Sequence, residues 1–236
     1  MLQSLAANLA KDAMQPQRKF RFTREWLGVN YRWVAGWNGV TNVDFFELFP
    51  GARDLTIDLQ IRTGPENLLA HEVYYLCAIA KLIDARRIFE FGTFDGQTTL
   101  HLAMNLPEAE ITTVALPPGQ TIVPGERDIV PGARFAGRPE AARITQLLGD
   151  STEMHFDHVY GQFDFVFIDG GHDYAAVRSD TRNALRLVRP GGVIAWDDYP
   201  PWEGVKRVVE RVARNHAVYR IDRTKLAVLV TEGSKG

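Results

Sequence analysis

The chain has 236 residues, of which 45% are hydrophobic and 24% are charged, and its formal net charge is −2. This length and composition predict one soluble α/β domain with a sizeable core and leave little room for two full domains. Because so small a net charge creates no global positive field, nucleic acids and anionic membranes are disfavoured as partners and a small, roughly neutral substrate is favoured. The single cysteine, Cys77, excludes an intramolecular disulfide framework and a cysteine-rich zinc site, and it favours a reducing compartment.

The N-terminal part of the chain has a different pattern from the rest. Residues 1–15 place apolar residues at helical spacing without the unbroken apolar core of a signal peptide, and no apolar run reaches the roughly 18 to 20 residues that span a bilayer. We therefore expect a cytoplasmic protein without a membrane partner. We also expect residues 1–65 to form a helical and aromatic cap or lid and residues 66–236 to form the main domain. The cap's aromatic side chains cover the core or a homodimer partner, an interpretation that we favour over direct contact with substrate.

From Pro65 onward, the 3.6-residue repeat of helices alternates with the short apolar runs of buried strands. This alternation predicts an α/β fold with a Rossmann-like, doubly wound, mostly parallel seven-stranded sheet and right-handed crossovers. Residues 117–139 are rich in proline and glycine and lack periodicity, so they form either a lid or binding segment or an insertion without such a role. The expected elements are a helix from 65 to 83, a strand at 87–91, a helix at 98–105, strands at 111–116, 144–148 and 163–168, a helix capped by Asp173 that continues to 188, a strand at 193–196, a helix at 205–212, and closing strands at 217–221 and 226–231.

Five carboxylates fall at or near the carboxyl ends of the expected strands: Glu90, Asp150, Asp169, Asp197 and Asp198. In an open α/β sheet these ends converge on one crevice, where ligands bind. Burying carboxylates is costly without cations, hydrogen-bond donors or water, so we expect a metal or a cationic or hydroxyl-rich ligand nearby. The alternative is that individual carboxylates, Asp150 among them, cap helices or bind loop amides.

The turn after the first of these strands reads Glu90-x-Gly92-x-x-x-Gly96. Its glycines let the backbone approach a ligand closely, because glycine has no side chain and tolerates positive φ. The turn matches neither the Gly-x-Gly-x-x-Gly fingerprint of dinucleotide sites nor the Lys-Ser/Thr ending of a phosphate-binding loop. Since like charges repel, Glu90 fits a ligand with a cationic end better than a pyrophosphate. S-adenosylmethionine, with its ammonium and sulfonium groups, is such a ligand.

Four segments form a specific set: residues 89–99 (FEFGTFDGQTT), 148–151 (LGDS), 163–174 (FDFVFIDGGHDY) and 189–199 (RPGGVIAWDDY). The first looks like motif I of the class I S-adenosylmethionine-dependent methyltransferases. In order and spacing, the other three resemble the small-molecule O-methyltransferase branch related to macrolide-sugar and catechol enzymes. The resemblance covers residues 66–231 and implies an enzyme that methylates a hydroxyl group of a small-molecule acceptor.

The resemblance also implies the cofactor site. The turn from Gly92 to Gly96 would cradle the amino-acid end of S-adenosylmethionine, Glu90 would shape the turn, and the residues after the third strand would lie beside the adenine. The full set of expected cofactor residues is Glu90, Gly92, Thr93, Phe94, Asp95, Gly96, Thr98, Asp150, Ser151 and Asp169.

One position departs from the family pattern. Ala115 stands where relatives usually carry an acid that holds the ribose hydroxyls. Losing a charge-assisted hydrogen bond weakens binding by about 1.5 to 3 kcal/mol, or roughly ten- to a hundredfold. The main alternative is therefore a non-catalytic Rossmann-like binding protein. A nicotinamide-dependent oxidoreductase ranks last, because the dinucleotide fingerprint is missing.

Metal-dependent members of this branch bind a divalent cation through acids at positions that correspond here to Asp169, Asp197 and Asp198. Oxygen ligands suit Mg²⁺, admit Mn²⁺ or Ca²⁺, and disfavour zinc. The metal would lower the pKa of the acceptor hydroxyl and place its oxygen in line with the methyl group. In the other interpretation, Asp169 orients the cofactor or a loop, and the acidic pair caps the next helix. His172, assigned with Asp169 to catalysis, would either remove the acceptor proton or serve as a hydrogen-bonded structural residue.

Overall fold

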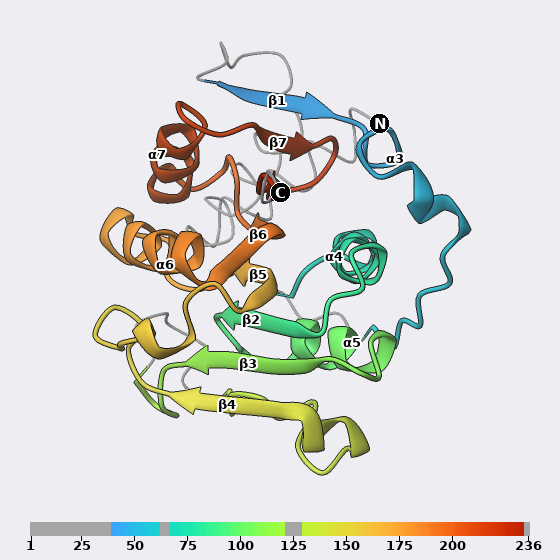
Figure 1. The fold of residues 1–236 in the computed structure, drawn as a ribbon. Helices are drawn as coiled ribbons and strands as arrows, with labels where there is room; N and C mark the ends of the chain where they lie inside the picture. The colour runs from blue at the N-terminus through green and yellow to red at the C-terminus, as the bar shows by residue number, and fades with distance from the viewer. Residues whose placement is uncertain (1–38, 62–66, 121–128, 234–236) are drawn as a thin grey trace, which may run out of the picture. The chain divides into compact units, whose positions relative to one another are not determined.

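The structure is a computed structural model, and it describes residues 39–61, 67–120 and 129–233. Strands and helices alternate along most of this length (Figure 1). The elements are β1 (Val40–Val43), α3 (Phe45–Leu48), η2 (Pro50–Asp54), α4 (Ala70–Leu82), β2 (Arg87–Phe91), α5 (Gln97–Asn105), β3 (Glu110–Ala115), η3 (Pro139–Arg143), β4 (Ile144–Leu148), η4 (Asp157–Val159), β5 (Phe163–Ile168), α6 (Tyr174–Leu187), β6 (Val188–Trp196), α7 (Glu203–Val212), β7 (Val218–Ile221) and β8 (Ala227–Val230).

The strands form one sheet in the order β1-β7-β8-β6-β5-β2-β3-β4. All pairings are parallel except those of β8, which runs antiparallel to both β6 and β7. The predicted Rossmann-like α/β class is confirmed, and an eighth strand joins the seven that the sequence predicts. That strand is β1, which pairs with β7 at one edge of the sheet and comes from the segment expected to form a cap. Four residues are too few to show a convincing two-residue alternation.

The expected boundary between a cap and the main domain, at residue 65, stays a prediction, because residues 1–38 and 62–66 lie outside the described residues. Four of the cap's aromatic residues, Trp26, Tyr31, Trp33 and Trp37, lie in the first of these ranges. The aromatic residues that are described cover the core. Phe45 is 1% exposed and stacks on Tyr75 of α4 with ring centroids 3.9 Å apart.

Most predicted elements match the structure to within a few residues. The clearest difference is β6, which begins at Val188 and not at Val193, and so includes the Pro-Gly-Gly sequence that we expected to lie between a helix and a strand. The register between β5 and β6 shifts at this point, because Phe163 faces Val188 whereas Phe165 faces Val193. This irregularity accommodates a proline, which cannot donate a ladder hydrogen bond.

The two faces of the sheet contribute to two separate cores. Along β5, Phe165 and Phe167 belong to the core that contains α4, whereas Val166 and Ile168 belong to the core that contains α6 and α7. This alternation follows from the two-residue side-chain period of a strand. Because both faces are covered, the central strands read as continuous apolar runs. In the described part of the chain, no helix has the length and apolarity needed to cross a membrane.

Candidate functional site

The turn that follows β2 passes directly against the end of β5. Gly92 has φ +102°, and a Cβ atom at this position would lie 2.0 Å from the carbonyl oxygen of Asp169. The Asp169 amide donates to the Phe91 carbonyl at 2.8 Å, which holds the two strand ends together. Only glycine fits here without moving the backbone. The structure thus brings the cofactor turn predicted at residues 92–96 next to one of the predicted metal-binding acids.

Glu90 and two threonines form a buried hydrogen-bonded group next to the turn. It is 1% exposed, and its Oε2 atom accepts hydrogen bonds from Thr99 in α5 and, at 2.6 Å, from Thr113 in β3. The hydroxyl of Thr113 is also 2.7 Å from that of Thr93. Burial raises the pKa of Glu90 to about 7, although both threonine hydrogen bonds act in the opposite direction. Its Oε1 atom is buried and has no hydrogen-bond partner among the described residues. The carboxylate is therefore suited to a cationic neighbour.

The remaining predicted cofactor residues occupy the same end of the sheet. Gly96, with φ +87°, precedes the first residue of α5, and Thr98 in the first turn of that helix is 8% exposed. Phe94 has φ +47°, which is unusual for a residue other than glycine. The carboxylate of Asp95 accepts a hydrogen bond from the Gln97 amide at 3.0 Å and forms an ion pair with Arg134.

The loop after β4 contains two of the predicted cofactor residues, Asp150 and Ser151. Asp150 binds within its own loop, where it accepts hydrogen bonds from the Thr152 amide at 2.8 Å and from its hydroxyl at 2.7 Å, as the loop-amide alternative proposes. Asp180 is a buried carboxyl on α6, and burial raises its pKa to about 7 although Ser151 acts in the opposite direction. Ala115 ends β3 opposite Leu148 and is 8% exposed, so no acid stands at this position.

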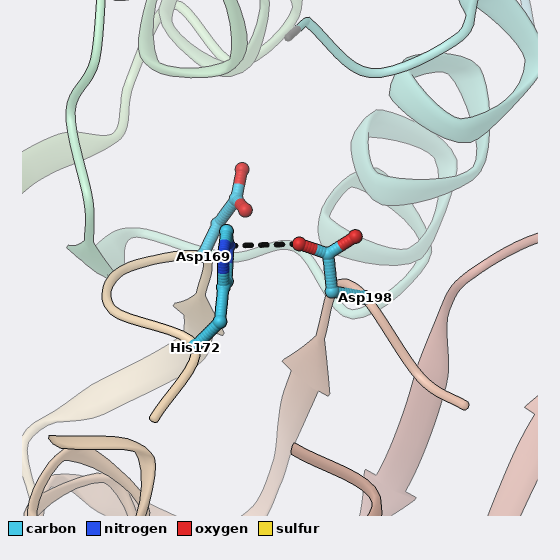
Figure 2. Close-up of side chains that lie close together, drawn as sticks. All are labelled: Asp169, His172 and Asp198. Carbon is cyan, nitrogen blue, oxygen red and sulfur yellow. Dashed lines mark ion pairs between the residues drawn. The ribbon is translucent and has the colours of Figure 1, made fainter. Parts of the chain in front are cut away.

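Asp169, His172 and Asp198 gather at the ends of β5 and β6, as Figure 2 shows. Their ligand atoms all lie within 4.8 Å of one another. His172 Nε2 is 2.8 Å from Asp198 Oδ2, and the imidazole ring stacks on Trp202 with centroids 4.3 Å apart. The pKa of Asp169 is raised well above its usual value by burial and by the charges of Asp197 and Asp198. The arrangement fixes the ring of His172 beside two carboxylates.

Lys225 contacts the acidic pair and is not among the candidate site residues that the sequence predicts. Its ammonium group lies 3.0 Å from Asp197 Oδ2 and 2.9 Å from Asp198 Oδ1, and the two carboxylates raise the pKa of the lysine despite its burial. Burial raises the pKa of Asp197 to about 7, whereas hydrogen bonds from His172 and Lys225 hold that of Asp198 far below its usual value despite burial. No motif marks a lysine between two closing strands, so the sequence offers no indication of this contact.

The predicted metal-binding acids fit a divalent cation in part. Asp169 and Asp198 belong to the three-residue group with His172, whereas Asp197 faces Lys225 and is not a member of it. The carboxylates of Asp169, Asp197 and Asp198 and the ammonium of Lys225 sum to two formal negative charges. In addition, Asp197 Oδ1 is buried without a hydrogen-bond partner among the described residues. A divalent cation would compensate this charge. In the described part of the chain, the acidic pair contacts Lys225 and His172, and the N-terminus of α7 has no side-chain cap.

Comparison with known proteins agrees with the predicted family resemblance. Residues 89–199 match the family model of a methyltransferase domain. A catechol O-methyltransferase of Mycobacterium tuberculosis is 26% identical over 178 residues, which cover 71% of this chain and 76% of that protein. Caffeoyl-CoA O-methyltransferase 2 of Zea mays is 30% identical over 153 residues, or 59% of this chain and 53% of that protein. The chain spans about half the length of the caffeoyl-CoA O-methyltransferases that it matches.

Solved structures give the same result for the fold. The O-methyltransferase TomG from Streptomyces achromogenes, in complex with SAM, has a TM-score of 0.53 and 24% identity, with 87% of this chain and 96% of that chain covered. The fold is thus Rossmann-like, and residues 89–199 are similar to a methyltransferase domain. Within that class, this chain is a relative of the class I S-adenosylmethionine-dependent O-methyltransferases, and the resemblance predicted from four sequence segments is confirmed.

Proposed function

We propose that this chain transfers the methyl group of S-adenosylmethionine to a hydroxyl group of a small-molecule acceptor, with the help of a divalent cation, most simply Mg²⁺. The observation that carries the proposal is the contact between the turn at Gly92 and Asp169. Because of this contact, a cofactor bound along the turn would lie next to the group of Asp169, His172 and Asp198. An acceptor held by that group would therefore meet the methyl donor.

The cofactor residues keep the roles that the family resemblance implies. S-adenosylmethionine, when bound, supplies the electrophilic methyl group. The turn and the N-terminal end of α5 would face its amino-acid end, and the unpartnered oxygen of Glu90 offers a buried acceptor to a cationic group. Ser151 would lie beside the adenine.

The group of Asp169, His172 and Asp198, called the acid group below, would hold and deprotonate the acceptor. A divalent cation, when bound through Asp169, His172 or Asp198, supplies positive charge that lowers the pKa of a coordinated hydroxyl. His172 Nε2 lies 2.8 Å from Asp198 Oδ2 and Trp202 stacks on the ring, so these two contacts orient the imidazole for proton transfer. Lys225 fixes Asp197 and Asp198 Oδ1, which leaves Asp198 Oδ2 directed toward His172.

A non-catalytic binding protein is the second candidate, and Ala115 is the observation that favours it. Such a protein would keep the fold and the acid group but bind the cofactor weakly or not at all. The sequence-based expectations of a cytoplasmic location, of a homodimer, and of neither nucleic-acid nor membrane partners stay predictions under either candidate.

The experiment that tests the proposal begins with calorimetric binding of S-adenosylhomocysteine, with and without Mg²⁺ and with NAD as a control. Micromolar binding of S-adenosylhomocysteine and none of NAD is the expected result. A labelled methyl group on S-adenosylmethionine is then followed into a panel of catechol and sugar hydroxyls. If neither binding nor transfer occurs with or without Mg²⁺, the binding-protein candidate replaces the methyltransferase.

The role of His172 has its own control. His172→Ala is expected to reduce turnover on the accepted substrate strongly, whereas His158→Ala, at an exposed position in η4, is expected to leave it unchanged. Equal turnover of the His172 variant and wild type would leave His172 with a structural role only.

A further inference from the structure

A segment within the long proline- and glycine-rich stretch at 117–139 is bound to the cofactor turn. We call residues 130–136 the outer segment. The Gly132 amide donates to the Phe94 carbonyl at 2.9 Å, and the Arg134 amide donates to the Asp95 carbonyl, also at 2.9 Å. These bonds use the carbonyl oxygens of the turn. They therefore take up none of the turn's amide N–H groups.

Side chains strengthen the same contact. Arg134 Nε lies 2.6 Å from Asp95 Oδ2, and both side chains are only about one-fifth exposed, at 21% and 19%. Phe135 is 7% exposed and packs on Gly96, where a Cβ atom would lie 2.7 Å from its ring. The ion pair is therefore shielded from solvent on one side, which makes it stronger than a fully exposed pair.

A third part of the chain completes the network. Asn67, which lies before α4, donates from Nδ2 to both carboxylate oxygens of Asp95 at 3.1 Å and accepts a hydrogen bond from Arg134 Nη2 at 3.2 Å. Asp95 also accepts a hydrogen bond from the Gln97 amide at the start of α5. One carboxylate thus ties together the chain before α4, the cofactor turn, the start of α5 and the outer segment.

The turn has a conformation that needs such support. Phe94 lies in the left-handed region at φ +47°, which is disfavoured for a residue with a Cβ atom. A turn that relaxes from this conformation in the free protein would have to be ordered again when a ligand binds. That ordering would reduce the affinity, because only the competent fraction of molecules binds.

We propose that Arg134 is a positioning residue for the cofactor: by holding Asp95, it keeps the turn in its binding conformation before S-adenosylmethionine arrives. The inference deepens the proposed function and rests on it, because it takes the turn to be the cofactor site. It also gives part of the stretch at 117–139, whose role the sequence leaves open, a definite task. Arg134 touches the turn and acts on the cofactor through Asp95.

The test compares Arg134→Gln with Arg138→Gln. Arg138 is a matched control, since it lies nearby and pairs with Glu140, away from the turn. We expect Arg134→Gln to weaken S-adenosylhomocysteine binding about tenfold and Arg138→Gln to change it less than about twofold. Arg134→Lys should recover part of the loss. In a double-mutant cycle with Asp95→Asn, the double variant should bind no more weakly than Asp95→Asn alone.

A readout without ligand separates positioning from general stability. Amide hydrogen exchange at residues 92–97 should become faster in Arg134→Gln than in Arg138→Gln, while exchange in β5 stays the same in both. Wild-type binding together with unchanged affinity in Arg134→Gln would overturn the inference and leave the proposed function intact. Failure of the wild type to bind S-adenosylhomocysteine would instead overturn the proposed function and the cofactor role of Arg134 together.

Discussion

Replacing Gly92 with alanine tests the contact that joins the cofactor turn to the acid group. The new Cβ atom would lie 2.0 Å from the Asp169 carbonyl oxygen and 2.8 Å from the Gly170 amide nitrogen, whereas ordinary carbon contacts lie at about 3.5 Å or more. The overlap is with backbone, so no side chain can rotate away. The ends of β2 and β5 must therefore separate, and the 2.8 Å hydrogen bond from the Asp169 amide to the Phe91 carbonyl is the first interaction lost.

The cost has two parts. Alanine at positive φ costs about 1 kcal/mol, and a lost buried backbone hydrogen bond costs about 1 to 3 kcal/mol. We therefore expect Gly92→Ala to lower the free energy of unfolding by about 2 to 4 kcal/mol, which corresponds to about 4 to 16 °C in Tm for a domain of this size. Gly137→Ala is the matched control, because Gly137 has φ +74° but no atom within 4 Å of its Cβ position.

Urea unfolding followed by circular dichroism gives both free energies, and calorimetry gives the affinity for S-adenosylhomocysteine. Gly137→Ala should lower the free energy of unfolding only by the cost of alanine at positive φ, about 1 kcal/mol. Its affinity for S-adenosylhomocysteine should not change. If the two variants lose the same stability, the close approach of the turn to Asp169 does not exist in the folded protein, and the argument for one continuous site fails with it.

Three further predictions concern residues around the site. Burial raises the pKa of Asp180 to about 7, so its ionisation is disfavoured in the folded state. As the pH rises from about 4 to 7, the Tm of the wild type should therefore fall relative to that of Asp180→Asn. Parallel curves of Tm against pH for the two proteins from about pH 4.5 to 8.5 would contradict this. Lys225→Met removes the ammonium group from two buried carboxylates and should lower the free energy of unfolding, measured by urea titration, by about 2 to 3 kcal/mol. The decrease should be smaller when an added divalent cation, or solvent, replaces the ammonium group. Ala115→Asp should tighten S-adenosylhomocysteine binding about tenfold in calorimetry by restoring the ribose acid, and an unchanged affinity would mean that another group holds the ribose.

The sequence by itself determined the fold class and most of the site's location. Strands β4 and β5 have the predicted bounds, and the cap of α6 is Asp173, whose carboxylate accepts from the Ala175 and Ala176 amides. These features depend on local periodicity and capping, which neighbouring residues encode. The acids at strand ends could be predicted to converge because a parallel sheet brings those ends to one edge, and Asp169 and Asp198 do meet there.

Only the tertiary structure decided the partners of these residues. Lys225 is separated from Asp197 by 28 positions, and Arg134 from Asp95 by 39, so no local pattern links either pair. The edge strand β1 pairs with β7, about 178 positions further along the chain, and its own four residues carry no recognisable period. Periodicity reports which face of an element is buried, whereas ion pairs and edge pairings depend on which distant segments fold against it. The sequence therefore predicts where the acids lie, and the folded chain determines which cation balances them.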